Sequence, residues 1–222
     1  MIKLVLLDFD DTLQQGTVPS VLAEYKDMDD KFHLAITEED GKKILKENDT
    51  LYTIFKAILD THNGKPDTHK IDEKEYWSAY SEIAGTHDDL TSVTDGARDL
   101  IAYCRAHDLK LGIVTNRDRL SLLRLLKKHQ LENWDVIVTI DDVKNQKPHS
   151  EPITRAIELA HVSPDETIMI GDSPNSDIVS AKFAGVKSIL FGERTPLEDA
   201  PPTYHIHHMK DAIEIIKQLS AH

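Results

Sequence analysis

The chain has 222 residues, of which 40% are hydrophobic and 29% charged, a balance typical of a folded globular protein rather than a disordered one. Its 39 acidic residues outnumber 26 basic ones, and the resulting net charge of -13 argues against general nucleic-acid binding. The single Cys104 excludes an intramolecular disulfide framework and a zinc site built from several cysteines. No run has the length of a transmembrane helix or the form of a signal peptide, so we expect a cytoplasmic protein without a membrane partner.

The first predicted element is a short apolar strand that leads directly into carboxylates. The residues Leu4-Val5-Leu6-Leu7 suit a strand buried on both faces of a parallel sheet, and Asp8-Phe9-Asp10 follows at once. Because side chains alternate along a strand, Asp8 and Asp10 should point the same way, where their repulsion favours a shared proton or a bound cation. The alternative is an ordinary strand followed by two turn-forming aspartates.

A long helical segment is predicted immediately after this strand. From about Val18 to Asp89 apolar residues recur at helical spacing, and Thr37 before three acidic residues is typical of a helix start. Residues 61–67 are predicted to form a loop, with another helix beginning near Ile71. We therefore predict an all-helical domain over residues 15–91, inserted into a core domain of residues 1–14 and 92–222.

From Asp95 onward the predicted helices and strands alternate. Strands are expected at 110–116, 136–140, 167–172 and 186–191, and helices at 97–107, 120–129, 152–160, 178–184 and 212–219. This alternation predicts an α/β fold with a doubly wound parallel sheet and right-handed crossovers. The stretch Tyr204-His205-Ile206-His207 is better explained as a last edge strand than as a metal-binding histidine cluster.

Polar residues follow several of the predicted strands, where a doubly wound sheet would gather them at one edge. Besides the first pair of aspartates, they are Thr115, Asn116, Lys147, Asp172 and Asp177. Several carboxylates, a hydroxyl and an ammonium group suit phosphoryl transfer assisted by Mg²⁺, which prefers oxygen ligands.

Roles for these residues follow from that chemistry. Asp8 would attack phosphorus to give an aspartyl-phosphate, and Asp10 would protonate the leaving oxygen and later take a proton from water. Lys147 would add positive charge, and Thr115, with Asn116 beside it, would hold the phosphate oxygens.

The ordered segments DFDDT, IVTN, QKP and GDSPNSD together resemble the four motifs of the haloacid dehalogenase (HAD) superfamily. The helical insertion resembles the cap of the subgroup of phosphoglycolate phosphatase and β-phosphoglucomutase. The resemblance implies a Rossmann-like core and a site in which Thr115 and Lys147 bind phosphate. It also implies Mg²⁺ bound by Asp8, the Asp10 carbonyl and Asp172, with Asp177 in the second shell. The chain departs from many relatives at Asp11, where Gly is common.

Three functions are weighed on this basis. The favoured one is a Mg²⁺-dependent phosphatase acting on a small phosphorylated metabolite, because Asp10 supplies an acid that a dehalogenase does not need. A β-phosphoglucomutase-like phosphomutase and a non-catalytic phosphate-binding regulatory protein are the alternatives. The protein is expected to be a monomer or homodimer, and the identity of the phosphate ester is not encoded in any motif of the cap.

Overall fold

The computed structural model describes residues 1–47 and 51–220, which form two compact units. One unit consists of Met1–Gln15 and Ser92–His222, and the other is the intervening Gly16–Thr91. Each unit has its own hydrophobic core, so the two are described separately. Within the described residues, no helix combines the length and apolar character needed to cross a membrane.

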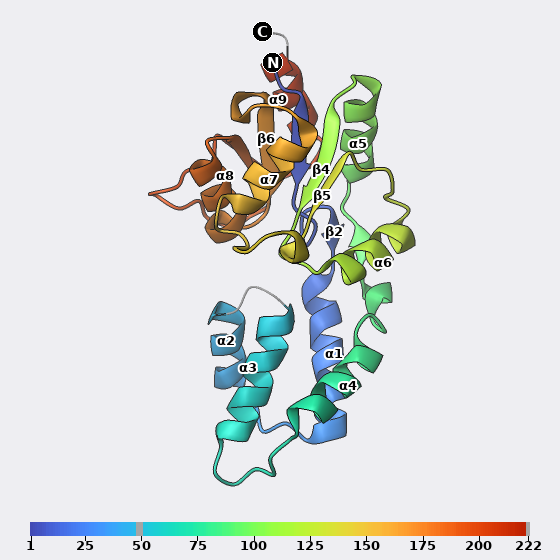
Figure 1. Cartoon of the computed structure of the whole chain (residues 1–222), viewed down its shortest axis with the longest axis vertical. Helices are drawn as coiled ribbons and strands as arrows, with labels where there is room; N and C mark the ends of the chain where they lie inside the picture. The colour runs from blue at the N-terminus through green and yellow to red at the C-terminus, as the bar shows by residue number, and fades with distance from the viewer. Residues whose placement is uncertain (48–50, 221–222) are drawn as a thin grey trace. The chain divides into compact units, whose positions relative to one another are not determined.

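The first unit is built on a six-stranded parallel sheet in the order β5-β4-β1-β6-β7-β8 (Figure 1). Its strands are β1 (Leu4–Leu7), β4 (Lys110–Val114), β5 (Val136–Val138), β6 (Thr167–Gly171), β7 (Lys187–Phe191) and β8 (Tyr204–Ile206). The predicted α/β fold with a doubly wound, Rossmann-like parallel sheet is therefore confirmed, including the edge strand at Tyr204–Ile206.

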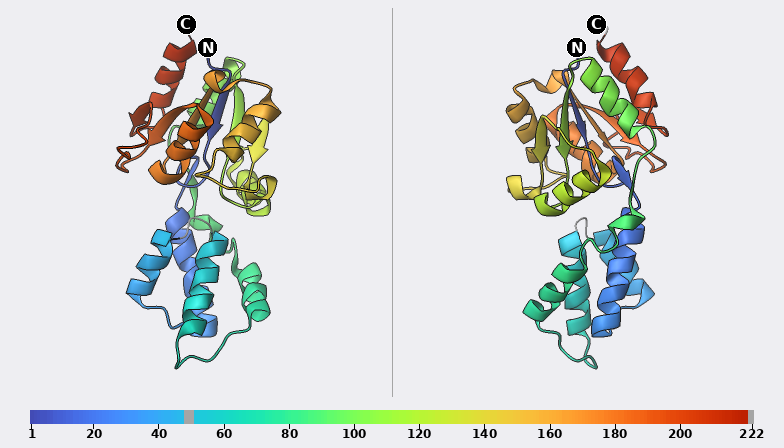
Figure 2. Two further views of the ribbon diagram at one scale, coloured as in Figure 1. Left: turned by 60° about the vertical axis from the view of Figure 1, so that its left-hand side comes forward. Right: turned by 90° about the vertical axis from the view of Figure 1, so that its right-hand side faces the viewer.

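Helices cover both faces of this sheet (Figure 2). Along β1, Val5 and Leu7 pack into one cluster and Leu4 and Leu6 into the other, as expected for a strand buried on both sides. The first face is covered by α5 (Ala97–Ala106), α6 (Arg119–His129) and α9 (Asp211–Ser220). The second face is covered by α7 (Glu151–Ala160) and α8 (Val179–Ala184).

The carboxyl ends of the three central strands lie next to one another. Leu7 at the end of β1 is in register with Ile113 of β4 on one side and Ile170 of β6 on the other. Residues that follow these strands therefore meet at one edge of the sheet, which is where open α/β folds place their ligands.

Short helical turns shift two of the predicted boundaries. The strand expected at 136–140 ends at Val138, because Thr139 and Asp142 form a reciprocal capping box that starts the 3₁₀ turn η2 (Ile140–Asp142). The helix expected at 178–184 is preceded by a π-helical turn, η4 (Pro174–Ile178). Two further turns, η1 (Asp88–Leu90) and η3 (Pro164–Glu166), were not predicted. A two-stranded antiparallel sheet pairs β2 (Gln14–Gln15) with β3 (Ser92–Val93), which precede and follow the helical segment in the sequence.

The second unit is helical, with α1 (Thr17–Phe32), α2 (Glu38–Glu47), α3 (Leu51–Gly64) and α4 (Glu73–Ile83) around one apolar cluster. The helix start predicted at Thr37 is confirmed, because Thr37 and Asp40 bond each other's backbone N–H groups.

The loop predicted at residues 61–67 is wrong in its first half, because α3 continues to Gly64. His62, within the predicted loop, is buried in α3: its Nδ1 accepts the Ala35 N–H at 3.0 Å and its Nε2 lies 2.9 Å from the His69 carbonyl oxygen. These contacts to flanking backbone extend the helix beyond the point where Asn63-Gly64 suggested a turn.

Candidate active site

A buried lysine joins two aspartates at the carboxyl edge of the sheet. The Lys147 ammonium lies 2.6 Å from an oxygen of Asp8, 2.6 Å from an oxygen of Asp177, and 2.8 Å from the Val114 carbonyl oxygen. The side chain of Lys147 is only 2% exposed. Charged groups this deeply buried are tolerated when each is paired and hydrogen-bonded, and here all three meet that condition.

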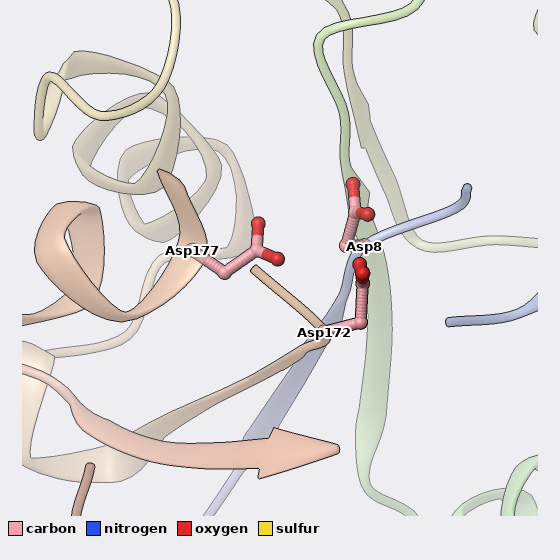
Figure 3. Close-up of side chains that lie close together, drawn as sticks. All are labelled: Asp8, Asp172 and Asp177. Carbon is pink, nitrogen blue, oxygen red and sulfur yellow. The ribbon is translucent and has the colours of Figure 1, made fainter. Parts of the chain in front are cut away.

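Asp172 completes a cluster of three carboxylates with Asp8 and Asp177, whose oxygens come within 4.8 Å of one another (Figure 3). Asp8 follows β1, Asp172 follows β6, and Asp177 reaches back from η4. Three carboxylates at this spacing suit a hard cation such as Mg²⁺, which takes oxygen ligands. Asp172 is also contacted by the Arg194 guanidinium at 3.2 Å and by the Thr12 hydroxyl at 3.4 Å.

Burial and mutual repulsion shift the protonation of this cluster when no metal is bound. Burial raises the pKa of Asp8 well above its usual value; Lys147 opposes this shift, whereas Asp177, Asp172 and Asp10 add to it. Burial, followed by the charge of Asp177, raises the pKa of Asp172 to about 7. Burial alone would lower the pKa of Lys147, but its two aspartate partners outweigh that effect and raise it. The cluster is thus short of positive charge.

The position of Asp177 depends on a glycine at the end of β6. A Cβ atom on Gly171 would lie 2.2 Å from an oxygen of Asp177, so any larger residue would displace that carboxylate. This oxygen, Oδ2, accepts the Ser173 N–H at 3.0 Å, and the other oxygen, Oδ1, accepts a hydrogen bond from the Lys147 ammonium. The π-helical turn that carries Asp177 is a feature often found at functional sites.

Asn116 holds the loop that carries Lys147. Its amide donates to the Lys147 carbonyl oxygen at 2.9 Å and accepts the Lys147 N–H at 3.0 Å. This pair of hydrogen bonds fixes the backbone from which the ammonium reaches the two aspartates. The neighbouring Thr115 is buried after β4, and its hydroxyl oxygen accepts the Arg117 N–H at 3.1 Å.

Asp10 lies in a separate network beside the carboxylate cluster. The Arg117 guanidinium donates to both Asp10 oxygens, at 3.0 Å from Nε and 2.6 Å from Nη2. The Gln14 amide donates to Asp10 at 2.9 Å, and its oxygen lies 3.2 Å from Nε2 of His129. Since a carbonyl oxygen only accepts, Nε2 of His129 is the protonated nitrogen in this arrangement.

Asp11 lies in a tight turn directly after β1. Asp11 has a φ of 54°, in the left-handed region that glycine adopts most readily and that aspartate tolerates better than most residues. The chain then folds back, with the N–H groups of Leu13 and Gln14 both donating to the Phe9 carbonyl oxygen at 3.0 Å. This tight turn returns Gln14 to the side of Asp10.

The family model for haloacid dehalogenase-like hydrolases matches residues 5–191, which contain most of β1, all of β4 and β6, and all of the carboxylates described above. The chain belongs to this family. Membership agrees with the resemblance inferred from the four sequence motifs, and it confirms at family level the prediction of an HAD-like phosphatase.

Three proteins of known name are similar to this chain in sequence or in structure. It is 33% identical over 181 residues to the pyrophosphatase PpaX of Bacillus mycoides, covering 79% of this chain and 82% of that protein. A predicted phosphoglycolate phosphatase from Haemophilus somnus superposes with a TM-score of 0.81 at 16% identity, covering 97% of this chain and 98% of that one. The putative HAD-hydrolase YfnB from Bacillus subtilis, solved bound to magnesium, gives 0.76 at 20% identity, covering 97% and 98%. At these identities the two structures establish the fold.

The structure brings most of the predicted site residues of this HAD-like chain into one region. Asp8, Lys147, Asp172 and Asp177 are in mutual contact or close to it. The side-chain amide of Asn116 hydrogen-bonds the Lys147 backbone. Its binding of phosphate stays a prediction.

Three residues in this region were missed by the sequence reasoning: Arg117, Gln14 and Arg194. Arg117 follows the predicted strand end directly, so its position could have suggested a role. Arg194 follows the last residues of β7 and lies outside the four motifs, and nothing in the sequence marks Gln14 as buried.

Proposed function

We propose that this protein is a Mg²⁺-dependent phosphatase that hydrolyses a small phosphorylated metabolite through an aspartyl-phosphate intermediate. The observation that carries the proposal is the contact of Lys147 with Asp8, in a buried cluster with Asp172 and Asp177 at the edge of the sheet. This arrangement joins a carboxylate nucleophile to a fixed cation and to further oxygen ligands, which is what phosphoryl transfer requires.

Asp8, Asp172 and the backbone carbonyl of Asp10 would hold Mg²⁺, with Asp177 supporting them through Lys147 and the Ser173 N–H. When bound, the ion supplies positive charge that offsets the repulsion between a carboxylate and an anionic phosphate. The fit rests on the donor set: three buried carboxylates whose charges Lys147 and Arg194 balance only in part.

The chain's own residues then carry two displacement steps. One oxygen of Asp8 is held by Lys147, and the other attacks phosphorus, so that a P–O bond to Asp8 forms as the bond to the leaving group breaks. Asp10 enters this step protonated and gives that proton to the leaving oxygen, which leaves it as the carboxylate that Arg117 binds. In the second step Asp10 takes a proton from water, the water oxygen bonds to phosphorus, and Asp8 is released with inorganic phosphate. Thr115 lies after the neighbouring strand, where its hydroxyl can hold an oxygen of the transferred group.

Inorganic pyrophosphate is the first substrate to test, because PpaX proteins, named pyrophosphatases, match most of this chain. Small phosphate esters, including sugar phosphates and phosphoglycolate, form the rest of the panel. The test measures release of inorganic phosphate with Mg²⁺ and with the metal removed by chelation. A phosphomutase would instead convert a sugar phosphate to an isomer without net phosphate release.

Three variants test the assigned roles. Asp8→Asn should lower turnover at least about a thousandfold and prevent trapping of a phosphorylated protein. Asp10→Asn should lower turnover by about 10²- to 10⁴-fold, with little change in Mg²⁺ affinity because its carbonyl is the ligand. Asp172→Ala should weaken Mg²⁺ affinity, so high Mg²⁺ should restore part of the activity.

Asp165→Asn, an exposed change in the same unit, is the matched control and should leave turnover unchanged. Phosphate binding without turnover across the whole panel would contradict the proposal and favour a regulatory role. Near-normal turnover of Asp10→Asn would contradict the acid/base assignment alone.

A further inference from the structure

The strongest feature not used by the proposed reaction is the pairing of Arg117 with Asp10. The Arg117 side chain is 7% exposed and meets the carboxylate with two nitrogens, the geometry in which arginine binds carboxylates most tightly. A buried guanidinium has lost most of its hydration, so its charge acts on nearby groups more strongly than a surface charge would.

Asp10 is held from its other side as well. Gln14 is fully buried and donates to Oδ1 of Asp10, while its own oxygen receives the Nε2–H of His129, which is also buried. The chain of contacts from His129 through Gln14 therefore limits the orientations of the Asp10 carboxylate. Because the same carboxylate binds Arg117, the guanidinium is fixed in relation to it.

The location of the leaving group follows from the role of Asp10. To pass a proton, Asp10 must come within about 2.6–3.2 Å of the leaving oxygen. The Arg117 nitrogens lie 2.6 and 3.0 Å from the Asp10 oxygens, so the guanidinium lies within roughly 6 Å of that leaving oxygen. At that separation the positive charge of the guanidinium attracts a leaving group that is itself an anion.

We propose that Arg117 is a specificity-determining residue that favours substrates whose leaving group carries its own negative charge close to the scissile oxygen. The substrate class is a phosphoanhydride or a phosphate ester with a phosphate or carboxylate beside the cleaved bond. The inference rests on the proposed phosphatase reaction and narrows its substrate.

The acidity of the whole chain also makes a cation beside the leaving group necessary. At a net charge of -13, and with four aspartates around the reaction centre, the protein repels an anionic leaving group unless a cation stands next to it. Lys147 is committed to Asp8 and Asp177, on the nucleophile's side. Arg117 is the cation placed at the acid, on the leaving-group side.

The test compares two substrates that differ in charge but hardly in size: 3-carboxyphenyl phosphate and 3-carbamoylphenyl phosphate, with inorganic pyrophosphate as a third. The quantity measured is the ratio of kcat/KM for the charged over the uncharged ester, in Mg²⁺. The variants are Arg117→Gln, which removes the charge, and Arg117→Lys, which keeps it. Arg155→Gln, an exposed arginine on α7, is the matched control.

We expect the wild-type protein to prefer the carboxylate ester, and Arg117→Gln to lower the ratio by about tenfold. Cleavage of pyrophosphate should fall in parallel, Arg117→Lys should keep most of the preference, and Arg155→Gln should leave it unchanged. The preference should also weaken as salt is raised from about 0.05 M to about 0.5 M.

A purely structural role for Arg117 predicts an unchanged ratio of kcat/KM, because loosening Asp10 slows the cleavage of both esters equally. If the ratio is the same in the wild type and Arg117→Gln while both cleave the esters, the specificity role is wrong and the phosphatase assignment stands. If the wild type cleaves none of the three substrates or any other phosphoester in Mg²⁺, the proposed function itself fails, and this inference fails with it.

Discussion

The two units of the molecule use buried polar groups in different ways. In the sheet unit, buried charges are paired with other charges: Lys147 with Asp8 and Asp177, and Arg117 with Asp10. In the helical unit, buried polar side chains bind backbone: His62 bridges two loop segments, Glu24 accepts the Gly85 N–H at 2.8 Å, and the Tyr76 hydroxyl donates to the Phe55 carbonyl oxygen at 3.0 Å.

We infer that the paired charges of the sheet unit serve the proposed reaction and that the backbone contacts of the helical unit serve stability. A backbone contact satisfies a donor or an acceptor and needs no further partner. A cluster with more carboxylates than cations keeps an unmet demand for positive charge, as the raised pKa values of Asp8 and Asp172 indicate. Substitutions in the two units should therefore have different signatures.

Lys147→Met should produce the largest effect on stability. It leaves Asp8 and Asp177 buried without their cation, and breaking such a pair costs about 3–5 kcal/mol. Because the folded protein then favours protonated carboxyls, the loss should be smallest near pH 4 and grow as the pH rises above the ordinary aspartate pKa. Urea unfolding of the wild type and Lys147→Met at several pH values measures this loss of stability.

The control for that change is Lys217→Met, which removes a surface lysine paired with Glu214 on α9. Its unfolding should differ little from that of the wild type at any pH, since exposed ion pairs contribute little. A pH-independent loss in Lys147→Met would mean that lost packing, rather than uncompensated charge, dominates.

Gly171→Ala and Gly41→Ala compare the two units with the same substitution. The new Cβ at position 171 would overlap Asp177, so we expect about 1–3 kcal/mol of destabilisation and about a hundredfold loss of turnover. Gly41 lies within α2 with no atom within 4 Å of the added carbon, so Ala should stabilise that helix by up to about 1 kcal/mol. Thermal unfolding and phosphate release measure both effects.

If both glycine substitutions lowered stability and turnover equally, the close approach of Asp177 would not be what requires a glycine at the end of β6. A conformational rearrangement limited to Asp177 would appear as lost turnover with little change in the melting temperature.

His62→Ala should destabilise the helical unit and leave the sheet unit unaffected. The Ala35 N–H and the His69 carbonyl both lose a buried partner, at a cost of about 2 kcal/mol or more. The two tryptophans serve as separate reporters, Trp77 in α4 and Trp134 before β5. With 5-fluorotryptophan, the Trp77 resonance should change at lower urea than in the wild type while the Trp134 resonance does not. A joint shift would show that the two units unfold together.

The sheet unit was more predictable from sequence than the helical unit, for a physical reason. A strand buried on both faces must be a continuous apolar run, and its end must be polar, so Leu4 to Asp8 shows both the strand and the site. In the helical unit, residues 61–67 were predicted to form a loop, yet α3 continues to Gly64, where His62 is held by Ala35, 27 residues earlier, as well as by His69. Tertiary contacts of that kind leave no local pattern.

Within the site, the positions of residues could be predicted better than their partners. Residues that follow strand ends, such as Asp172, could be expected at this edge of the sheet from the order of the motifs. The partners of those residues could not be assigned, because the Arg117–Asp10 and Gln14–His129 contacts join segments more than a hundred residues apart. Asn116 illustrates the limit: its position at a strand end predicted a ligand for phosphate, but nothing in the sequence predicted the hydrogen bond from its side chain to the Lys147 backbone.

The smallest expected effect concerns Cys104, whose thiol is fully buried in the sheet unit. Burial raises the pKa of this thiol to about 12, so roughly a thousandfold fewer thiolates exist at pH 8 than for a free cysteine. Alkylation of the native protein should therefore be very slow and should report opening of this core. Lys147→Met should speed it, whereas His62→Ala should not, since its damage is confined to the other unit. Equal acceleration by both variants would show that loss of the helical unit also opens the sheet unit.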